Sequence, residues 1–422
     1  MSNANEREIP FNRVTMHVLY FHQHFSTPAG STGTRSYEMA QRLIARGHKV
    51  TMVCGSGQMA SSGLQQEPVN GMRKGTVDGI DIIEFCLPYS NYDSFLKRSW
   101  IFVLFAWHSV KLALQLQYDL LFATSTPLTA GIPCIVASIL RRKPFVFEVR
   151  DLWPELPREM GVITNPVVLT AMSVLEWVSY HTAKACIGLS PGIVQGIVRR
   201  GIDSEKVGMV PNGCDLDLFD PDTGVTLRPD GVSQDDFLAI FSGAHGIANG
   251  LDAVLDAAAE LKRKGRNDIK LVFIGDGRLK PALVKRASNE SLDNCLFLNP
   301  VPKLELTAYL RGADAGLMIL DNIPAFYYGT SPNKFFDYIS IGLPVINNYP
   351  GWLAGIIIEN SCGCALEPGN PKSFAESLEQ LADNPDLTKQ MGLNARALAV
   401  REFDRKDLGN RFVDFLEKVY RN

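Results

Sequence analysis

TMHVLYF at residues 15–21, PAGSTGTR at 28–35 and RGHKVTMVC at 46–54 decide the fold of this chain. The first segment is an apolar run that predicts a strand, and the second is a loop rich in glycine and threonine. A helix is expected from about Ser36 to Arg46, just before a glycine, and a second strand from Lys49 to Cys54. This order of strand, loop, helix and strand predicts a βαβ unit with parallel strands and a right-handed crossover.

Short apolar strands and helical segments alternate along the rest of the chain, on both sides of a polar, proline-containing segment at 220–236. This alternation is typical of α/β proteins. Further strands are expected at 80–85, 120–123, 145–148, 186–189 and 207–210, and then at 238–242, 270–274, 295–298, 315–319 and 344–346. Helices of the second series are expected at 250–264, 279–288, 303–311, 333–341 and 371–383.

The length of 422 residues predicts more than one domain, because a single hydrophobic core stops growing at a smaller size. We expect two Rossmann-like, doubly wound domains, at 1–212 and 213–404, that face each other across a cleft. A C-terminal helix at about 405–422 is expected to pack back on the first domain. Such sheets bind ligands at the carboxyl ends of their strands, so the functional site is expected in the cleft.

Composition narrows the class of protein further. Hydrophobic residues make up 46% of the chain and charged residues 21%, which is ordinary for a globular protein and excludes disordered, collagen-like and coiled-coil chains. The eight cysteines lie mostly singly in apolar segments without a CxxC pair, which favours reduced core residues over a zinc site. The segment MSNANEREIPFNR at 1–13 lacks the apolar core of a signal peptide, so a cytoplasmic protein is expected. No nucleic-acid partner is expected.

The most apolar segment, Trp100 to Leu116, is interrupted by His108 and Lys111 and is too short to span a bilayer. It is interpreted either as a core helix or as a helix lying on the inner face of the plasma membrane. The same two interpretations apply to the basic clusters, which are ordinary solvated pairs or a contact with anionic lipid. These clusters are Lys97-Arg98, Arg141-Arg142-Lys143 and Arg199-Arg200.

Four motifs follow one another along nearly the whole chain: RGHKV at 46–50, VPNGCDLDLF at 210–219, FIGDGRLK at 273–280 and SPNKFFDYISIGLPVI at 331–346. Together they resemble the family-four glycosyltransferases of the GT-B fold. EVRDLWPE at 148–155 and SGAHGIANGLD at 242–252 are similar to the bacterial branch that assembles O-antigen and capsule, which includes N-acetyl-L-fucosamine transferases.

The resemblance implies a retaining enzyme with a nucleotide-sugar donor, UDP by default. The sugar is expected to be an N-acetylated amino or deoxyamino sugar, and the acceptor to be undecaprenyl-diphosphate-linked or a saccharide. No His/Cys cluster offers a cation site, so the enzyme is expected to work without a metal or another cofactor.

The donor site is expected at the start of the helix at 333–341. Its amides and dipole favour a phosphate near Ser331 and Asn333, and Lys334 adds a positive charge, unless Lys334 is merely solvent-exposed. The resemblance places the carboxylate that holds the ribose hydroxyls at Asp337. Val301, by the same resemblance, belongs to the backbone that meets the base, although an ordinary hydrophobic connection explains it equally well.

This chain departs from the family pattern in two places. Gly329 stands where the first of two family glutamates is usual, so backbone groups from Tyr327 to Thr330, Tyr328 among them, are the expected substitutes. The Arg and Lys that commonly clamp the diphosphate are absent from 243–249. The expected replacements are the glycine-rich turn with Gly243 and Gly246, the turn with Gly275 and Asp276, and the charge of Lys280 or its competitor Arg278. His245 is either sugar-facing or structural.

The first domain is expected to supply the acceptor side and the catalytic groups. The loop with Gly30, Gly33, Thr34 and Arg35 faces the cleft and is expected to contact a diphosphate, the alternative being a simple turn with a surface arginine. Glu148, Arg150 and Asp151 end a strand and are the expected catalytic residues, since they can polarise an acceptor hydroxyl; alternatively they form an ion pair that braces the loop.

Three other functions compete with glycosyl transfer. A nucleotide-sugar 2-epimerase uses a similar two-domain fold but needs its own acid-base carboxylates and histidine. A non-catalytic nucleotide-sugar-binding subunit is favoured by Gly329 and the missing Arg/Lys pair. An NAD-dependent oxidoreductase is disfavoured, because the first loop lacks the GxGxxG spacing.

Overall fold

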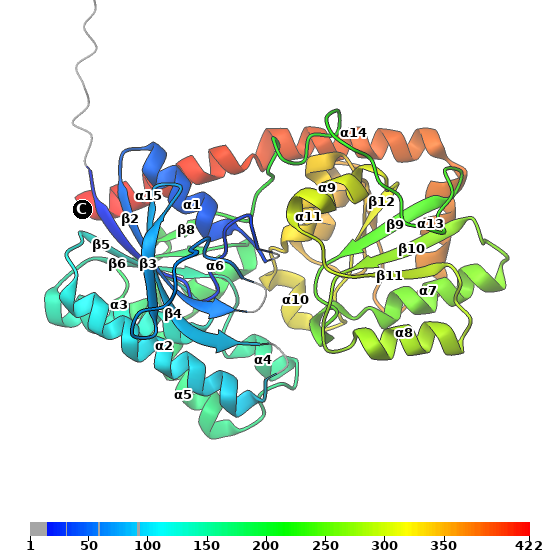
Figure 1. Cartoon of the computed structure of the whole chain (residues 1–422). Coiled ribbons are helices and arrows are strands. Elements are labelled where there is room, and N and C mark those ends of the chain that lie inside the picture. Colours follow the sequence, from blue (N-terminus) through cyan, green and yellow to red (C-terminus); the bar gives the residue numbers. More distant parts are fainter. Residues whose placement is uncertain (1–14, 31, 58–59, 91–92) are drawn as a thin grey trace, which may run out of the picture.

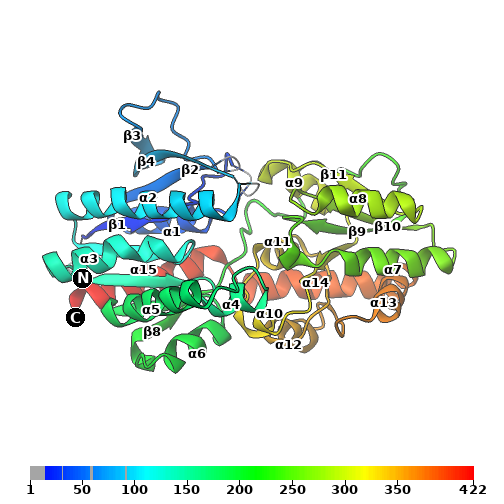
Figure 2. The same ribbon diagram turned by 90° about the horizontal axis from the view of Figure 1, so that it is seen from below.

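The computed structural model describes residues 15–30, 32–57, 60–90 and 93–422, and these form two α/β halves side by side (Figure 1). The expectation for residues 1–13 lies outside the described residues, as does Ser31 of the first loop. Each half is built on one sheet, and helices cover both faces of it (Figure 2). The expected architecture of two Rossmann-like domains is confirmed.

The first sheet has the strand order β3-β4-β2-β1-β5-β6-β7-β8. Seven of its strands are parallel: β1 (His17–Phe21), β2 (Lys49–Gly57), β4 (Ile80–Tyr89), β5 (Leu120–Thr124), β6 (Phe145–Val149), β7 (Ala185–Gly188) and β8 (Val207–Met209). The antiparallel edge strand β3 (Met72–Val77) was not expected. It joins β4 through Asp78 and Gly79, both at positive φ (49° and 81°), a turn that suits a two-residue hairpin.

The helices of the first half are α1 (Arg35–Ala45), α2 (Phe95–Gln115), α3 (Ile132–Arg141), α4 (Glu155–Glu159), α5 (Pro166–Thr182) and α6 (Pro191–Arg199). Side chains cap three of them, because Ser94, Asn165 and Ser190 accept hydrogen bonds from the first-turn amides of α2, α5 and α6. Helix α2 buries Ile101, Phe105 and Ala113 against the sheet and leaves its other face exposed. The segment therefore combines a core helix with an exposed apolar face.

The second sheet has the order β11-β10-β9-β12-β13-β14 and is entirely parallel. Its strands are β9 (Phe237–Ser242), β10 (Ile269–Ile274), β11 (Cys295–Leu298), β12 (Ala315–Met318), β13 (Val345–Asn347) and β14 (Gly363–Ala365). Its helices are α7 (Asp252–Arg263), α8 (Lys280–Asn289), α9 (Lys303–Arg311), α10 (Pro324–Gly329), α11 (Asn333–Ile341), α12 (Trp352–Glu359) and α13 (Pro371–Asp383). Strand β14, the short helices α10 and α12 and the long helix at 385–402 were missed from the sequence.

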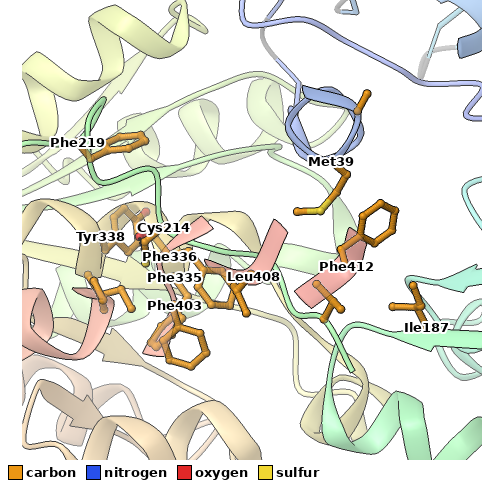
Figure 3. Close-up of a cluster of buried hydrophobic side chains, with 14 of the residues drawn as sticks. Met39, Ile187, Cys214, Phe219, Phe335, Phe336, Tyr338, Phe403, Leu408 and Phe412 are labelled. Carbon is orange, nitrogen blue, oxygen red and sulfur yellow. Dashed lines mark hydrogen bonds between the residues drawn. The ribbon is translucent and has the colours of Figure 1, made fainter. Parts of the chain in front are cut away.

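Two last helices cross from the second half back to the first (Figure 1). Helix α14 (Pro385–Glu402) packs on α11, and α15 (Arg405–Arg421) packs on α1. Figure 3 shows the apolar side chains that follow this path, from Phe336 and Phe403 to Leu408 and Phe412. The ring of Phe336 lies 5.3 Å from that of Phe403, and Phe412 lies 5.2 Å from Phe122 of the first sheet. One continuous core therefore extends through both halves.

Replacing Phe412 with alanine is expected to destabilise the protein by about 3–5 kcal/mol, because the fully buried ring leaves a cavity between α15 and the first sheet. The measurement is the urea concentration at the midpoint of unfolding. Lys418→Ala on the exposed side of the same helix is the control and should leave that midpoint unchanged. Equal midpoints for both variants would show that α15 does not stabilise the first half.

Candidate functional site

A cavity of about 350 Å³ lies between the two halves, at the carboxyl ends of their strands. It is lined by residues of the first half, the connection and the second half: His22, His24, Thr32, Gly33, Thr126, Arg150, Asp151, Leu189, Asn212, Leu320, Thr330, Ser331, Pro332 and Asn333. The cavity therefore occupies the place in which doubly wound folds bind ligands.

Arg35 is not in this cavity. Its buried guanidinium donates to Glu148 Oε1 at 2.9 Å and to the carbonyl oxygens of Val210 (2.7 Å) and Pro211 (2.6 Å). The expected diphosphate contact and the alternative of a surface arginine are both wrong, because the buried guanidinium is committed to Glu148 and to the backbone after β8. Arg35 instead ties α1 to the connection that follows β8.

Glu148 lies behind the cavity, at the end of β6. Its carboxylate is fully buried and contacts Arg35 on one side and the Nε of Arg150 at 3.4 Å on the other. Burial raises its pKa, but the two arginines outweigh this effect and hold the pKa below its usual value. Glu148 therefore stays charged and orients Arg150, rather than touching a ligand as expected.

Arg150 and Asp151 do line the cavity. The Nη1 of Arg150 lies 3.5 Å from His22 Nε2. Burial raises the pKa of Asp151 to about 6, although the charge of Arg150 acts in the opposite direction. A carboxyl with such a pKa exchanges protons near neutrality and can hold or release the proton of a hydroxyl.

His22 and His24 are cavity residues that the sequence analysis missed. Burial lowers the pKa of His22 well below its usual value and that of His24 to about 4, and Arg150 adds to both effects. Both rings are therefore neutral at pH 7 and can donate or accept a hydrogen bond. Their position directly after β1 was the signal, since the carboxyl end of a central parallel strand faces the ligand.

Gly33 and Asn333 meet across the cleft. A Cβ on Gly33 would lie 2.8 Å from the Asn333 Nδ2 atom, so the loop and the start of α11 touch. Beside them the backbone N–H of Asn212 donates a hydrogen bond to Ser331 Oγ at 3.1 Å. Of the other loop residues, Thr34 is buried and Gly30 donates to the Thr27 carbonyl in a turn; neither lines the cavity.

Lys334 is half-buried beside the second sheet and not simply solvent-exposed. Its Nζ donates to Asn249 Oδ1 at 2.6 Å and lies 4.1 Å from the centre of the Phe241 ring. Burial lowers its pKa to about 7. A Cβ on Gly243 would lie 3.7 Å from the same Nζ, so the ammonium lies directly against the backbone after β9. Within the part of the chain that the structure describes, Lys334 makes no ion pair.

The turns after β9 and β10 approach each other through glycines. Gly275 has a φ of +151°, and a Cβ there would lie 1.9 Å from the Gly243 carbonyl oxygen. Gly277 approaches His245 in the same manner, and the Asp276 carbonyl accepts a hydrogen bond from the His245 amide at 2.9 Å. Gly246 begins a short 3-10 helix with open space around it.

His245 is buried among phenylalanine rings, and its ring nitrogens have no hydrogen-bond partner among the described residues. Burial lowers its pKa to about 4. The centre of its ring lies 6.0 Å from that of Phe241 and 6.2 Å from that of Phe297. The geometry therefore favours the structural role for His245.

Lys280 is not a free cation. Its Nζ donates to the carbonyl oxygens of Gly275 (2.8 Å) and Leu298 (2.7 Å), and so it joins the ends of β10 and β11. This corrects its assignment as the missing phosphate-binding charge, since the side chain is committed to the backbone. Its competitor Arg278 is exposed.

Asp337 is buried on α11 and pairs with Lys303, a residue that the sequence analysis did not single out. The Lys303 Nζ lies 3.5 Å from Asp337 Oδ1, and this oxygen has no hydrogen-bond partner among the described residues. Val301, two residues before Lys303, is half-buried against the same core. Asp337 and Val301 therefore lie close to the same end of α9.

Tyr328 contacts the first half rather than the second sheet. Its hydroxyl donates to Glu155, and its carbonyl accepts from Ser190 Oγ at 3.0 Å. A Cβ on Gly192 would lie 2.2 Å from that carbonyl oxygen. The expected donor contact is therefore replaced by a contact between the halves, because α10 packs on α4 and α6.

In the described part of the chain, no group of three or more His, Cys, Asp or Glu side chains is placed to hold a metal ion. Among the helices built from those residues, none combines the length and the apolar character needed to cross a membrane. Metal independence itself stays a prediction.

The two parallel sheets and the cleft between them define a protein with the GT-B fold of glycosyltransferases. Residues 30–213 match the family model described as glycosyl transferase 4-like domain, and residues 226–398 match the model described as glycosyl transferases group 1. The chain belongs to the family-four GT-B glycosyltransferases.

Curated relatives match about half of this chain. It is 28% identical over 211 residues to a D-inositol 3-phosphate glycosyltransferase of Pseudarthrobacter chlorophenolicus, covering 48% of this chain and 47% of the relative. It is 23% identical over 186 residues to the alpha-D-kanosaminyltransferase of Streptomyces kanamyceticus, covering 43% and 46%. The chain thus spans about half the length of the curated relatives it matches. Neither name refers to O-antigen or capsule, so that branch stays a prediction.

Solved structures share the whole fold. The crystal structure of HepE from Anabaena in complex with UDP and glucose matches with a TM-score of 0.68 over 95% of this chain and 99% of that one, at 16% identity. At this identity the likeness shows the fold alone.

Replacing Gly275 with alanine is expected to disrupt the two turns that follow β9 and β10. The added methyl group would overlap the Gly243 carbonyl oxygen, and alanine disfavours the positive φ of this position. The melting temperature should fall sharply. Gly265→Ala is the matched control, since Gly265 also has a positive φ (76°) but no atom lies within 4 Å of the added Cβ, and it should cost only about 1–2 kcal/mol. Equal losses would show that the close approach is unimportant.

Proposed function

We propose that this protein is a retaining glycosyltransferase that moves a sugar from a nucleoside diphosphate donor to an acceptor in the cleft. The observation that carries the proposal is the half-buried cation of Lys334, which makes no ion pair in the described chain. Lys334 follows Asn333 at the head of α11, and Asn333 lines the same cavity as Arg150 and Asp151. A buried ammonium without a carboxylate is costly, and an anionic ligand offsets that cost.

In this proposal the second half, 213–404, binds the donor. The amides at the start of α11 and the Lys334 ammonium neutralise the diphosphate, and Asn249 fixes the ammonium in place. Asp337 accepts hydrogen bonds from the ribose hydroxyls through the oxygen that lacks a hydrogen-bond partner among the described residues. UDP is the preferred nucleotide, in keeping with the UDP bound to HepE.

The first half, 1–212, binds the acceptor next to Arg150 and Asp151. The bond between the anomeric carbon and the phosphate oxygen breaks, and its electron pair goes to the phosphate. The acceptor oxygen bonds to that carbon on the same face, and its proton passes to the departing phosphate oxygen. Arg150 stabilises the negative charge that develops, and Asp151 orients the acceptor hydroxyl. No metal takes part in this scheme.

The acceptor is undecaprenyl-diphosphate-linked or a saccharide, and the product belongs to a surface polysaccharide such as O-antigen or capsule. The donor sugar is an N-acetylated amino or deoxyamino sugar, a choice supported by the amino-sugar name of the kanosaminyltransferase relative. The enzyme works on the cytoplasmic side, in peripheral contact with an anionic membrane. A 2-epimerase would instead release an isomerised donor, and a binding subunit would release nothing new, so product analysis separates the three functions.

Donor binding is expected to weaken as the pH rises above about 7, because the Lys334 pKa is about 7 and only its protonated form neutralises the diphosphate. UDP affinity, measured by calorimetry from pH 6 to pH 9, should fall up to about tenfold per pH unit above 7. Lys334→Ala should weaken binding and remove this part of the pH dependence. Lys389→Ala, an exposed lysine on α14, is the control. A Lys334→Ala variant with unchanged UDP affinity and pH profile would contradict the donor site.

Replacing Asp151 with asparagine is expected to lower kcat about 10²–10⁴-fold and to leave UDP affinity unchanged, because the carboxylate acts on the acceptor side. In the wild-type enzyme the rate should fall as the pH drops through about 6, where Asp151 becomes protonated. The variant should lack this acid limb. An unaltered acid limb in the variant would assign it to another group.

A further inference from the structure

Helices α2, α3 and α5 form one layer on the first sheet, with α3 in contact with both others (Figure 2). Large apolar side chains point outward from this layer. The α2 face, as we name it, consists of Leu96, Trp100, Val103, Trp107 and Leu114 of α2, Ile139 and Leu140 of α3, and Val167, Val174 and Trp177 of α5, all exposed. The α2 members lie three, four or seven residues apart, which is one or two helical turns, and so they lie on one side of the helix.

The exposed Asp, Glu, Lys and Arg side chains of this layer carry only positive charge. The three helices contain a single acidic residue, Glu176, which is buried and pairs with Arg200 at 2.6 Å. The chain as a whole has 45 acidic residues in 422, so a surface of this size without an exposed carboxylate is unusual. Lys111 lies 5.5 Å from the Trp107 ring centre, and Arg142 follows α3 at an exposed position. Neither makes an ion pair with a described residue.

Aromatic rings connect the α2 face to the cleft. His24 lines the cavity, and the centre of its ring lies 4.7 Å from that of Tyr89 at the end of β4. Tyr89 in turn stacks on Phe102 of α2 with a centroid distance of 5.6 Å. The cleft lies at the carboxyl ends of the strands, and helix α2 starts shortly after the carboxyl end of β4. The exposed Leu96 and Trp100 therefore lie at the cleft end of the helix.

We propose that the α2 face docks on an anionic lipid bilayer and so holds the cleft beside acceptors carried in that bilayer. Tryptophan and aliphatic side chains with flanking cations suit the boundary between lipid headgroups and acyl chains. Anionic headgroups supply the negative charge that the face lacks. A second copy of this chain fits less well, because a symmetric dimer would place cations against cations with no carboxylate to pair them.

The inference about the acceptor rests on the proposed function, but docking itself does not, and the experiment separates the two. The purified protein is sedimented without donor in the presence of phosphatidylcholine vesicles or of vesicles with about 30% phosphatidylglycerol, a content that carries substantial surface charge. The wild type should bind the anionic vesicles at least tenfold more tightly than the neutral ones. W100S/W107S should lose at least tenfold of that binding, and K111E/R142E should lose the preference for anionic lipid.

The control is I358S/L393S, which removes two exposed aliphatic side chains of the second half and should bind vesicles like the wild type. All variants should keep the wild-type melting temperature and UDP affinity. Docking is overturned if the wild type ignores anionic vesicles, if W100S/W107S binds them equally well, or if the wild type is a dimer that W100S/W107S converts to monomers. Vesicle binding without any UDP binding would refute the proposed function and leave docking intact.

Discussion

The proposed donor site depends on the position of the Lys334 ammonium, which is bonded to Asn249 and lies over the Phe241 ring. Burial makes the charged form of this lysine costly, and no described carboxylate offsets the cost. The backbone around it is equally constrained, because the turns after β9 and β10 touch at Gly243 and Gly275. Helix α11 begins at Asn333, one residue before Lys334, so the positive end of its dipole lies close to this lysine. A cation, the positive end of a helix dipole and side-chain-free backbone together favour a diphosphate over any neutral ligand.

The opposite wall of the cleft depends on a buried chain of charges. Arg35, Glu148 and Arg150 are linked, and only the last reaches the cavity. Separating any of these three side chains would leave a buried charge without a partner, which is energetically costly. The ion pairs therefore hold the three side chains in one arrangement. The two walls are kept opposite each other by α15, which joins the cores of both halves, and by direct contacts such as Asn212 with Ser331. Positioning of donor and acceptor thus rests on buried parts of the fold.

Much of the fold was predictable, because buried parallel strands are apolar runs and glycines end several helices. Strand β3 was missed since its sequence, MRKGTV, is charged and lies at an exposed edge. Helices α10 and α12 are too short to show a clear period. At the site, Lys334 was singled out from its place at a helix start, and Asp337 from the family resemblance. The burial of Arg35 and the commitment of Lys280 to backbone carbonyls depend on contacts distant in sequence, which no local pattern encodes. The contact of Tyr328 also depends on a residue distant in sequence, because its partner Glu155 lies in the first half.

The decisive measurement is a crystal structure of the protein with UDP. The diphosphate is expected to lie within hydrogen-bond distance of the Lys334 ammonium and the first amides of α11, with the ribose hydroxyls at Asp337. A nucleotide bound elsewhere on the molecule, with Lys334 still held only by Asn249, would contradict the proposed donor site.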